Sequence, residues 1–554
     1  DTSPPTLSNV SIVSNNTTNT LAKAGDEITL TFTASETINE PVVTFQSGSS
    51  SITDSSVTYT NTSGNTWTAK YTSNASDTDG SVSFSIAFTD GSNAGTDVTT
   101  GSGSVIFDNT LPTVVSFTTS TSSGSYNQAE EIVITANTTE SVQSGNTITV
   151  TLDTSDTVLL TAASTGTTLV GTYTVGSGDT SAGLTVSSFA IGTVADTAGN
   201  AMTSTTLPVA GSIFGSKTIT IDTASPNLTQ VTAITTPSND TTPSYIFTTD
   251  EAGTISTSIS QNFSTSSSAS TGSDQTITFN TLPEGTYSGE TITVTDTAGN
   301  PGSITIPDFV IDTAAPTVNA IETTAFLWGS VLNATEDNSD GTVSVTTSGA
   351  EDGQTLTITL NGATYTNTVS SNSVTVTISA AGLQALTNGS SYTLTADVSD
   401  TAGNTATQVT SSSFSVETTA PTISEVLLAA DNSTLTVTMS EAVYNTNGGS
   451  GSLEVSDFAL SISGGVASIN TTPSTISSSG NEYTLGLTIS GTPNGSETLT
   501  VVPSSSSAIY DLAGNVASTT QSNNTVSLND TSPPTLSNVS IVSNNTTNTL
   551  AKAG

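Results

Sequence analysis

The sequence contains no cysteine, no histidine and no arginine, and its 554 residues include only four lysines. Without cysteine and histidine the chain has no disulfides, no thiolate nucleophile, no side chain that ordinarily titrates near pH 7, and none of the usual zinc or iron ligands. A glycosidase-like pair of catalytic carboxylates would need a cleft-forming insertion, and no segment is long enough to supply one. The sequence therefore predicts a protein that is not an enzyme.

The shortage of basic residues excludes a second set of functions. The chain carries 46 acidic residues against 4 basic ones, a net charge of −42, and a sequence pI near 4.1. Nucleic-acid binding and attraction to anionic membranes both need lysine and arginine. No apolar run approaches the roughly 18 residues of a membrane-spanning helix, and the first residues carry no basic and apolar leader. We expect no nucleic-acid partner and no direct membrane insertion in this segment, which we interpret as the interior of a longer protein.

What is present favours an all-β fold. Charged residues make up only 9% of the chain and hydrophobic residues 33%, unlike a highly charged disordered protein. Apolar residues alternate at period two over short runs, as in Ile28, Leu30 and Phe32, and Gly, Asn and Asp turns separate these runs. In the first hundred residues we predict seven strands, near residues 6–13, 27–34, 41–45, 56–60, 66–72, 81–89 and 103–107.

An exact internal repeat is the most informative feature of the chain. Residues 1–25 recur without change as residues 530–554, which gives a period of 529 residues. Identity of this length predicts one full repeat and the beginning of the next. Two arrangements follow: either the covalent array continues into another copy, or residues 530–554 insert into the first domain of a neighbouring chain as a donated strand. The predicted partners are further copies of the same repeat, covalently in tandem, with lateral association between arrays as an open alternative.

A weaker repeat divides these 529 residues. An acidic residue followed closely by proline recurs at Asp1, Asp108, Asp222, Asp312, Glu417 and Asp530, and proline favours a stiff, extended start to a first strand. We call the last five of these the boundary acids. A second motif near the end of most segments is DTAGN or DLAGN, at Asp196, Asp296, Asp400 and Asp511, with a degenerate DGSNAG at Asp90. We call the four regular copies the D-x-A-G-N loops.

Five domains of about 100 residues follow, the size of an immunoglobulin-like (Ig-like) β-sandwich. The predicted segments are 1–107, 108–221, 222–311, 312–416 and 417–529, with 530–554 as the first strand of the next copy of the first segment. Tyr287 and Tyr392 precede two of the D-x-A-G-N loops, where a tyrosine corner would fix the start of the sixth strand.

Several stretches resemble a known family. TLTITLNGATYTNTV and ISAAGLQALTNGSSYTLTADVSDTAGNTA in the fourth segment are similar to the bacterial Ig-like repeats of giant surface adhesins, and so are AGDEITLTFTASE in the first and TLTVTMSEAV in the fifth. The second and third segments match mainly through their proline and D-x-A-G-N motifs. The resemblance implies secreted or surface-attached tandem rods, often rigidified by calcium at domain junctions.

The topology of a sandwich brings three acidic positions of each segment to one end: the boundary acid, an acid after the second strand and the D-x-A-G-N aspartate. Three carboxylates beside backbone and Asn carbonyls suit calcium, which takes 6 to 8 oxygen ligands. The alternative is that D-x-A-G-N is only a good turn and the boundary acid only a cap. The candidate calcium ligands are Asp108, Glu140, Asp196, Asp222, Glu251, Asp296, Asp312, Glu351, Asp352, Asp400, Glu417, Glu441, Asp511 and Asp530.

The sequence thus predicts a structural, extracellular repeat protein of a bacterial cell surface: an adhesin stalk or surface fibre, stiffened by calcium at its junctions. Two alternatives stay open, a surface-layer protein and an adhesin whose individual domains bind a receptor or glycan. Trp67 and Trp328 are the only tryptophans, which are few for a sugar-stacking platform, and each is expected to be packed scaffold.

Overall fold

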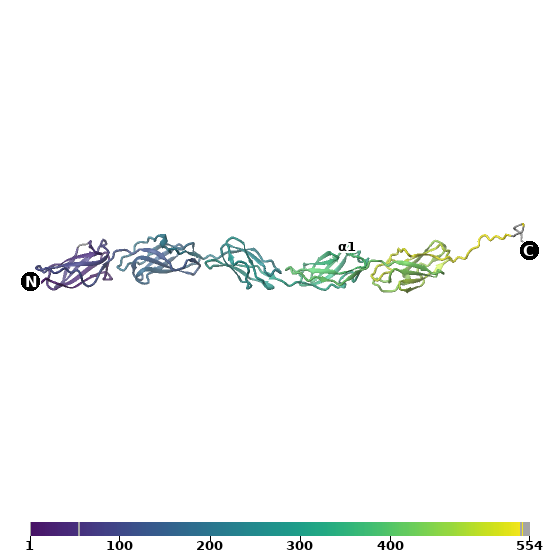
Figure 1. Ribbon diagram of the computed structural model, residues 1–554, viewed down its shortest axis with the longest axis horizontal. Helices are drawn as coiled ribbons and strands as arrows, with labels where there is room; N and C mark the ends of the chain where they lie inside the picture. The colour runs from purple at the N-terminus through teal and green to yellow at the C-terminus, as the bar shows by residue number, and fades with distance from the viewer. Residues whose placement is uncertain (1, 54–55, 543–545, 547–554) are drawn as a thin grey trace. The chain divides into compact units, whose positions relative to one another are not determined.

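The computed structural model describes residues 2–53, 56–542 and 546 of the chain, and almost all of its regular structure is β-strand (Figure 1). The chain divides into two compact units. One contains the residues up to Ala233 together with Ser244–Asn280 and Gly289–Pro307, and the other contains Ile234–Pro243, Thr281–Ser288 and the residues from Asp308 onward.

In the first segment two sheets face each other around one core. The first sheet has the order β1 (Leu7–Ser14), β3 (Glu27–Ala34), β7 (Thr66–Thr72), β6 (Thr58–Ser63); the second has the order β2 (Leu21–Ala22), β9 (Ile106–Phe107), β8 (Gly80–Ala87), β4 (Val42–Ser47), β5 (Ser50–Ser51). All neighbours are antiparallel except β2 and β9, which are parallel. This is the strand order of an Ig-like sandwich, and each of the seven predicted strands overlaps an observed one.

The alternating pattern explains why these strands form. Along β3, every second side chain is buried, including Ile28, Leu30 and Phe32, while threonines between them face outward. Burying an aliphatic or aromatic side chain of this size stabilises by about 1.5–3 kcal/mol. The buried residues of the segment, from Ile12 to Phe107, make one continuous cluster, which confirms the all-β expectation.

The second segment also belongs to the first compact unit and differs in its sheet layout. One sheet has six strands, in the order β10 (Val114–Thr118), β12 (Glu131–Val142), β15 (Gly166–Thr174), β14 (Thr157–Thr161), β13 (Thr147–Leu152), β17 (Val186–Ile191); the other has the order β11 (Gly124–Tyr126), β18 (Ile219–Asp222), β16 (Thr180–Ser181). The short 3-10 helix η1 (Ala210–Ser212) precedes β18. A single residue pair, Thr161 with Val170, links β14 to β15, so the pairing between these two strands is the shortest in the large sheet.

Strands of the third segment occur in both compact units. The first unit holds the sheet β19 (Leu228–Thr232), β20 (Ser244–Thr249), β23 (Gln275–Thr278) and the sheet β22 (Ser268–Ala269), β21 (Gly253–Thr257), β25 (Thr291–Thr295), β26 (Pro301–Thr305). The second unit holds the pair β24 (Gly285–Tyr287) and β27 (Phe309–Ile311). There the Tyr287 hydroxyl donates to the Pro283 carbonyl at 2.9 Å, the backward contact expected of a tyrosine corner.

The fourth segment, in the second unit, has three sheets and the only α-helix among the described residues, α1 (Ala380–Gln384; Figure 1). The sheets are β28 (Thr317–Val318), β30 (Gly341–Ser348), β33 (Ser373–Ile378); β32 (Ala363–Thr368), β31 (Thr355–Leu360), β35 (Leu394–Val398), β36 (Val409–Thr410); and β29 (Val331–Leu332), β37 (Phe414–Val416), β34 (Ser391–Tyr392), with the 3-10 helix η2 (Thr323–Ala325). Here the Tyr392 hydroxyl accepts from the Thr387 N–H at 2.9 Å. Trp328 is only 5% exposed and its ring packs against those of Phe326 and Phe414.

The fifth segment completes the second unit. Its sheets are β38 (Ile423–Leu428), β39 (Thr434–Met439), β43 (Glu482–Gly486), β42 (Ile476–Ser479); β40 (Phe458–Ser463), β45 (Thr498–Pro503), β46 (Thr525–Ser527); and β41 (Ser468–Ile469), β44 (Ile489–Ser490), with the 3-10 helix η3 (Val455–Asp457). Separate clusters of buried residues fill the fourth and fifth segments. Among the described residues, no helix has the length and hydropathy needed to cross a membrane.

Glu497 is a fully buried carboxylate in the fifth segment. Burial alone would raise its pKa, but backbone N–H groups of Val466, Ala467 and Asn494 donate to it at 2.9, 3.2 and 3.0 Å and lower the pKa to about 2. The folded state thus favours the charged form, so its stabilisation is present above the ordinary carboxyl pKa and is lost as the pH falls from about 4.5 to about 2.

We expect Glu497→Gln to lower the unfolding temperature of the fifth segment at pH 7 and to reduce its loss of stability between pH 4.5 and pH 2. Calorimetric melts over this pH range measure both effects. Glu482→Gln, at an exposed position in β43, serves as the control. An equal acid sensitivity in all three chains would contradict the assignment.

Candidate metal centres at the segment junctions

Each of the first four boundary acids lies at the end of the last strand of one segment. Asp108 follows β9, Asp222 is the last residue of β18, Asp312 follows β27 and Glu417 follows β37. Three of them continue the strand pairing, since their N–H groups donate to Ala22, Ser238 and Leu332 carbonyls at 2.8, 3.0 and 2.9 Å. The boundary acid therefore has a fixed backbone position at the point where the next segment starts.

In the second segment the structure brings the three predicted acids together. Carboxylate oxygens of Asp108, Glu140 and Asp196 all lie within 4.8 Å of one another. Glu140 extends from β12, Asp196 begins the D-x-A-G-N loop after β17, and Asp196 is only 1% exposed. Asp79 of the first segment borders this group, because its carboxylate accepts from the Asn109 N–H at 2.8 Å.

Electrostatics in this group favour a cation. Burial, followed by the charges of Asp108, Asp196 and Asp79, raises the pKa of Glu140 to about 7. Burial also raises the pKa of Asp108, with Asp196 and Asp79 adding to it and a hydrogen bond from the Thr110 N–H opposing it. Like charges this close repel one another, and a divalent cation would remove the repulsion.

The third segment repeats the arrangement. Asp222, Glu251 and Asp296 also place their carboxylate oxygens within 4.8 Å of one another. Burial, then the charges of Asp222, Asp296 and Asp250, raises the pKa of Glu251. All of these residues belong to the first compact unit, as do those of the second segment.

The central glutamate of each group has an unsatisfied oxygen. The Oε2 atoms of Glu140 and Glu251 are buried and have no hydrogen-bond partner. An unpaired buried acceptor costs about 1–3 kcal/mol, so a missing ligand is a physical explanation for both. Carboxylate oxygens at this spacing are hard donors of the kind that calcium prefers, and the residues present therefore fit a calcium ion.

A feature that the sequence analysis missed is the role of the asparagine that closes each D-x-A-G-N loop. Asn200, Asn300, Asn404 and Asn515 each donate through Nδ2 both to the loop aspartate, at 2.8–2.9 Å, and to the backbone carbonyl of the boundary acid, at 2.8–2.9 Å. Their backbone N–H groups donate to the same aspartates at 2.7–2.9 Å. We call these residues the loop asparagines. They link two acidic positions about one segment apart in sequence.

The fourth segment does not bring its predicted acids together as a group of three within that distance. Glu351 Oε2 accepts from the Thr401 N–H at 2.9 Å, and although burial opposes ionisation, hydrogen bonds from Thr401 outweigh it and lower the pKa of Glu351. Asp352 accepts from the Ser371 N–H at 2.6 Å and is thereby engaged elsewhere. Asp312 and Asp400 keep the link through their loop asparagine.

The fifth segment is intermediate between these cases. Burial, then the charges of Asp511 and Glu417, raises the pKa of Glu441, so the three predicted acids influence one another. They do not meet the spacing of the two closer groups among the described residues. Asp530 is exposed and accepts from the Ser532 N–H at 2.8 Å. Asp1 lies outside the described residues.

Comparison with known proteins gives structural neighbours only. No protein-family profile matches the chain, and no curated protein matches it. One similar structure is a Ca2+-stabilised adhesin that helps an Antarctic bacterium reach out and bind ice, with 21% identity, coverage of 75% of this chain and 99% of that one, and a TM-score of 0.34. A second is a tetra-tandem repeat in the extending region of a large adhesion protein, with 17% identity, coverage of 74% and 100%, and a TM-score of 0.31.

A third similar structure is a bacterial immunoglobulin-like domain from the M. primoryensis ice-binding adhesin. It is 34% identical, and the match covers 19% of this chain and 96% of that domain, with a TM-score of 0.15. These neighbours are of the class that the sequence resemblance predicts. The fold assignment itself rests on the strand orders described above.

Proposed function

We propose that this chain is a stretch of the stalk of an extracellular bacterial adhesin, with a structural rather than a catalytic role. The exact recurrence of residues 1–25 as residues 530–554 and the Ig-like strand order support a tandem array. We extend to this chain the adhesin role of the proteins with similar structures. In this proposal each of the predicted segments, 1–107, 108–221, 222–311, 312–416 and 417–529, is one domain.

Calcium binding is the second part of the proposal. The observation that carries it is the pair of three-carboxylate groups, each with a buried and unpartnered glutamate oxygen. Asp108, Glu140 and Asp196 would hold one ion, and Asp222, Glu251 and Asp296 a second. An ion at either place would link the boundary acid to two loops of the following segment and would stiffen the chain there.

Calorimetric titration with calcium tests these two centres. We expect the combined substitutions Asp222→Asn and Asp296→Asn to remove one calcium equivalent from the chain, because each replaces a charged ligand with a neutral one. Asp274→Asn, an exposed acid of the same segment, should leave the stoichiometry unchanged. The buried cluster of the fifth segment should not respond, since each segment has a core of its own.

An unchanged stoichiometry in the double variant would show that the third-segment assignment is wrong. The stalk role has a separate test, cryo-electron microscopy of the native cell surface. Threads one molecule wide are expected, whereas a two-dimensional lattice would favour a surface-layer protein.

A further inference from the structure

The D-x-A-G-N loops have a second face that takes no part in the acidic groups. Their glycines, at positions 199, 299, 403 and 514, all have φ between +91° and +97°, a backbone conformation that glycine adopts without strain. The backbone carbonyl of the alanine before each glycine is not part of the acidic group to which the aspartate of the same loop belongs. In each junction, this part of the loop lies against the preceding segment.

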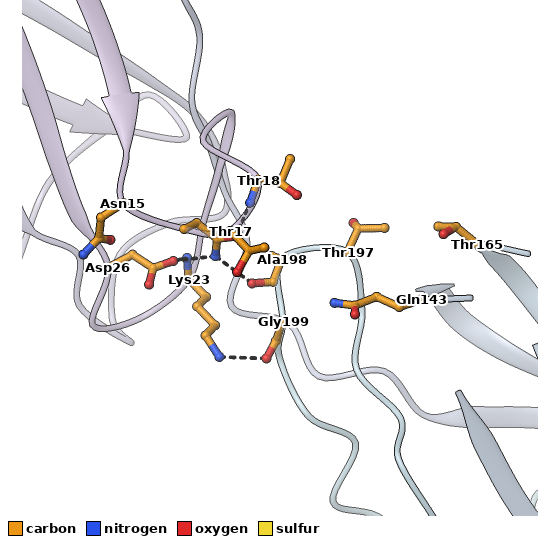
Figure 2. Close-up of a pocket in the computed structure, with 11 residues that line it drawn as sticks. Asn15, Thr17, Thr18, Lys23, Asp26, Gln143, Thr165, Thr197, Ala198 and Gly199 are labelled. Carbon is orange, nitrogen blue, oxygen red and sulfur yellow. Dashed lines mark hydrogen bonds between the residues drawn. The ribbon is translucent and has the colours of Figure 1, made fainter. Parts of the chain in front are cut away.

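The junction between the first and second segments shows the contact most fully. Asn16 donates through Nδ2 to the Ala198 carbonyl at 2.8 Å, and the Lys23 ammonium donates to the Gly199 carbonyl at 2.7 Å. Figure 2 shows the Lys23 side chain extending to the loop, with Asp26 beside it. The Asp26 carboxylate accepts from Asn16 Nδ2 at 2.7 Å and so orients the donor. All of these residues belong to the first compact unit.

The junction between the fourth and fifth segments, within the second unit, repeats the contact with different residues. Asn333 donates through Nδ2 to the Ala513 carbonyl at 3.0 Å, and the Ala334 N–H donates to Oδ1 of Asn515 at 2.7 Å. Asn333 is only 5% exposed. Burial of an amide side chain is favourable only when its donors are paired, so the Ala513 carbonyl is an essential partner.

At each of the other two junctions we find one contact of the same kind. The Asn239 N–H donates to the Ala402 carbonyl at 3.1 Å. At Gly299 a Cβ atom would lie 3.2 Å from Nδ2 of Asn127, so the preceding segment's asparagine again packs on the loop glycine. Four asparagines from the loops that precede the second strands, Asn16, Asn127, Asn239 and Asn333, thus meet four D-x-A-G-N loops.

We infer that these contacts are a metal-independent docking site, in which an asparagine loop of one segment binds the D-x-A-G-N loop of the next and limits bending at the junction. The inference goes beyond the proposed calcium centres, because the donors are amides and, at the first junction, also the Lys23 ammonium, and the acceptors are mostly backbone carbonyls. No acidic carboxylate of the centres is needed for it. Calcium and docking then use different atoms of the same loop.

The full chain without calcium tests the docking site at the junction of the fourth and fifth segments. Because the chain has no cysteine, spin labels are attached through cysteines introduced at the exposed positions Thr377 and Ser461, in β33 and β40. Pulsed electron paramagnetic resonance in chelator then measures the label-to-label distance distribution. We expect a narrow distribution in the parent chain and a clearly broader one in Asn333→Ser.

Asn333→Ser is chosen because the Asn333 Oδ1 atom also accepts from the Thr335 and Glu336 N–H groups at 2.9 and 3.0 Å. Serine keeps an oxygen for this turn but is too short to reach Ala513. Asn333→Asp keeps the same shape without the donor and should broaden the distribution as well. Asn361→Asp, in the exposed turn between β31 and β32, is the matched control.

Hydrogen exchange of the Ala334 amide gives a second measurement. Loss of one hydrogen bond from the docking site should make this amide exchange about tenfold faster in Asn333→Ser. Two results in chelator would overturn the inference. One is a label-to-label distance distribution in Asn333→Ser that is as narrow as the narrow distribution expected of the parent chain. The other is a distribution in the parent chain that is already as broad as the one expected of Asn333→Ser. A distribution that becomes narrow only when calcium is added would likewise overturn the docking site, because the restraint at this junction would then come from the ion.

Discussion

Raising the pH of the calcium-free chain from about 4.5 to about 7 is expected to destabilise the second segment. Burial and the neighbouring acids raise the pKa of Glu140 to about 7, so the folded state binds this proton more tightly than the unfolded state does. The native state then holds more protons across this window, and the free energy of unfolding falls as the pH rises through it. The loss levels off once the pH has risen past about 7.

Calcium should reverse this behaviour. The ion binds the ionised carboxylates of Asp108, Glu140 and Asp196, so its affinity increases as Glu140 loses its proton. Binding to the native state alone stabilises by about 2.7 kcal/mol at a hundredfold excess over Kd. With calcium in excess, we expect the unfolding temperature of the second segment to rise between pH 5 and pH 8, whereas in chelator it falls.

Calorimetry and hydrogen exchange of the second segment at pH 5, 6, 7 and 8 measure the two trends. Glu140→Gln should be more stable than the parent chain in chelator at pH 8, because it removes the buried charge, and should gain little from calcium. Glu131→Gln, an exposed acid on the same strand β12, is the control and should follow the parent chain. Parallel pH trends with and without calcium would contradict the proposed centre.

The sandwich and its acidic end could be predicted because both depend on short-range patterns. Period-two alternation fixes which side chains are buried, as along β3. The proline motifs and D-x-A-G-N loops predict where segments begin and where the sixth strand ends. A sandwich of this topology then brings Asp222, Glu251 and Asp296 together without further information.

The same reasoning fails at Glu351, which occupies the position of Glu140 in its own segment. The Thr401 N–H lies 2.9 Å from its carboxylate and holds it, while Ser371 holds Asp352. Which backbone donor faces a given carboxylate depends on loop geometry that no local pattern encodes. The five-residue helix α1 was missed for a related reason, since isolated helices of this length have little intrinsic stability and depend on tertiary packing.

The sequence also does not predict that the loop asparagines donate to the boundary acids. Asn515 is 98 residues from Glu417 in sequence, and its Nδ2 meets the Glu417 carbonyl only after the segment has folded. The repetition of asparagine at the end of all four D-x-A-G-N loops was the available indication. A turn alone does not require the same side chain at each repeat, because glycine and aspartate also tolerate that conformation.

Replacement of a loop asparagine should therefore strongly destabilise its segment. In Asn515→Asp the side chain keeps its shape but loses both Nδ2 hydrogen bonds, at 2.8 Å to Asp511 and 2.8 Å to the Glu417 carbonyl. Asn515 and Asp511 are each 1% exposed, so two carboxylates would meet with almost no water. Two lost hydrogen bonds at about 1–3 kcal/mol each, with like-charge repulsion added, give an expected loss of about 4 kcal/mol.

Chemical denaturation followed by hydrogen exchange of the fifth segment measures this loss at pH 7 in chelator. Asn523→Asp adds the same charge at an exposed position of that segment and should cost almost nothing. Equal stability of the two variants would show that the loop asparagine does not hold the boundary acid in place. Calcium adds a second comparison, because the new carboxylate joins Glu417, Glu441 and Asp511: an ion bound there should restore part of the lost stability in Asn515→Asp and none in Asn523→Asp.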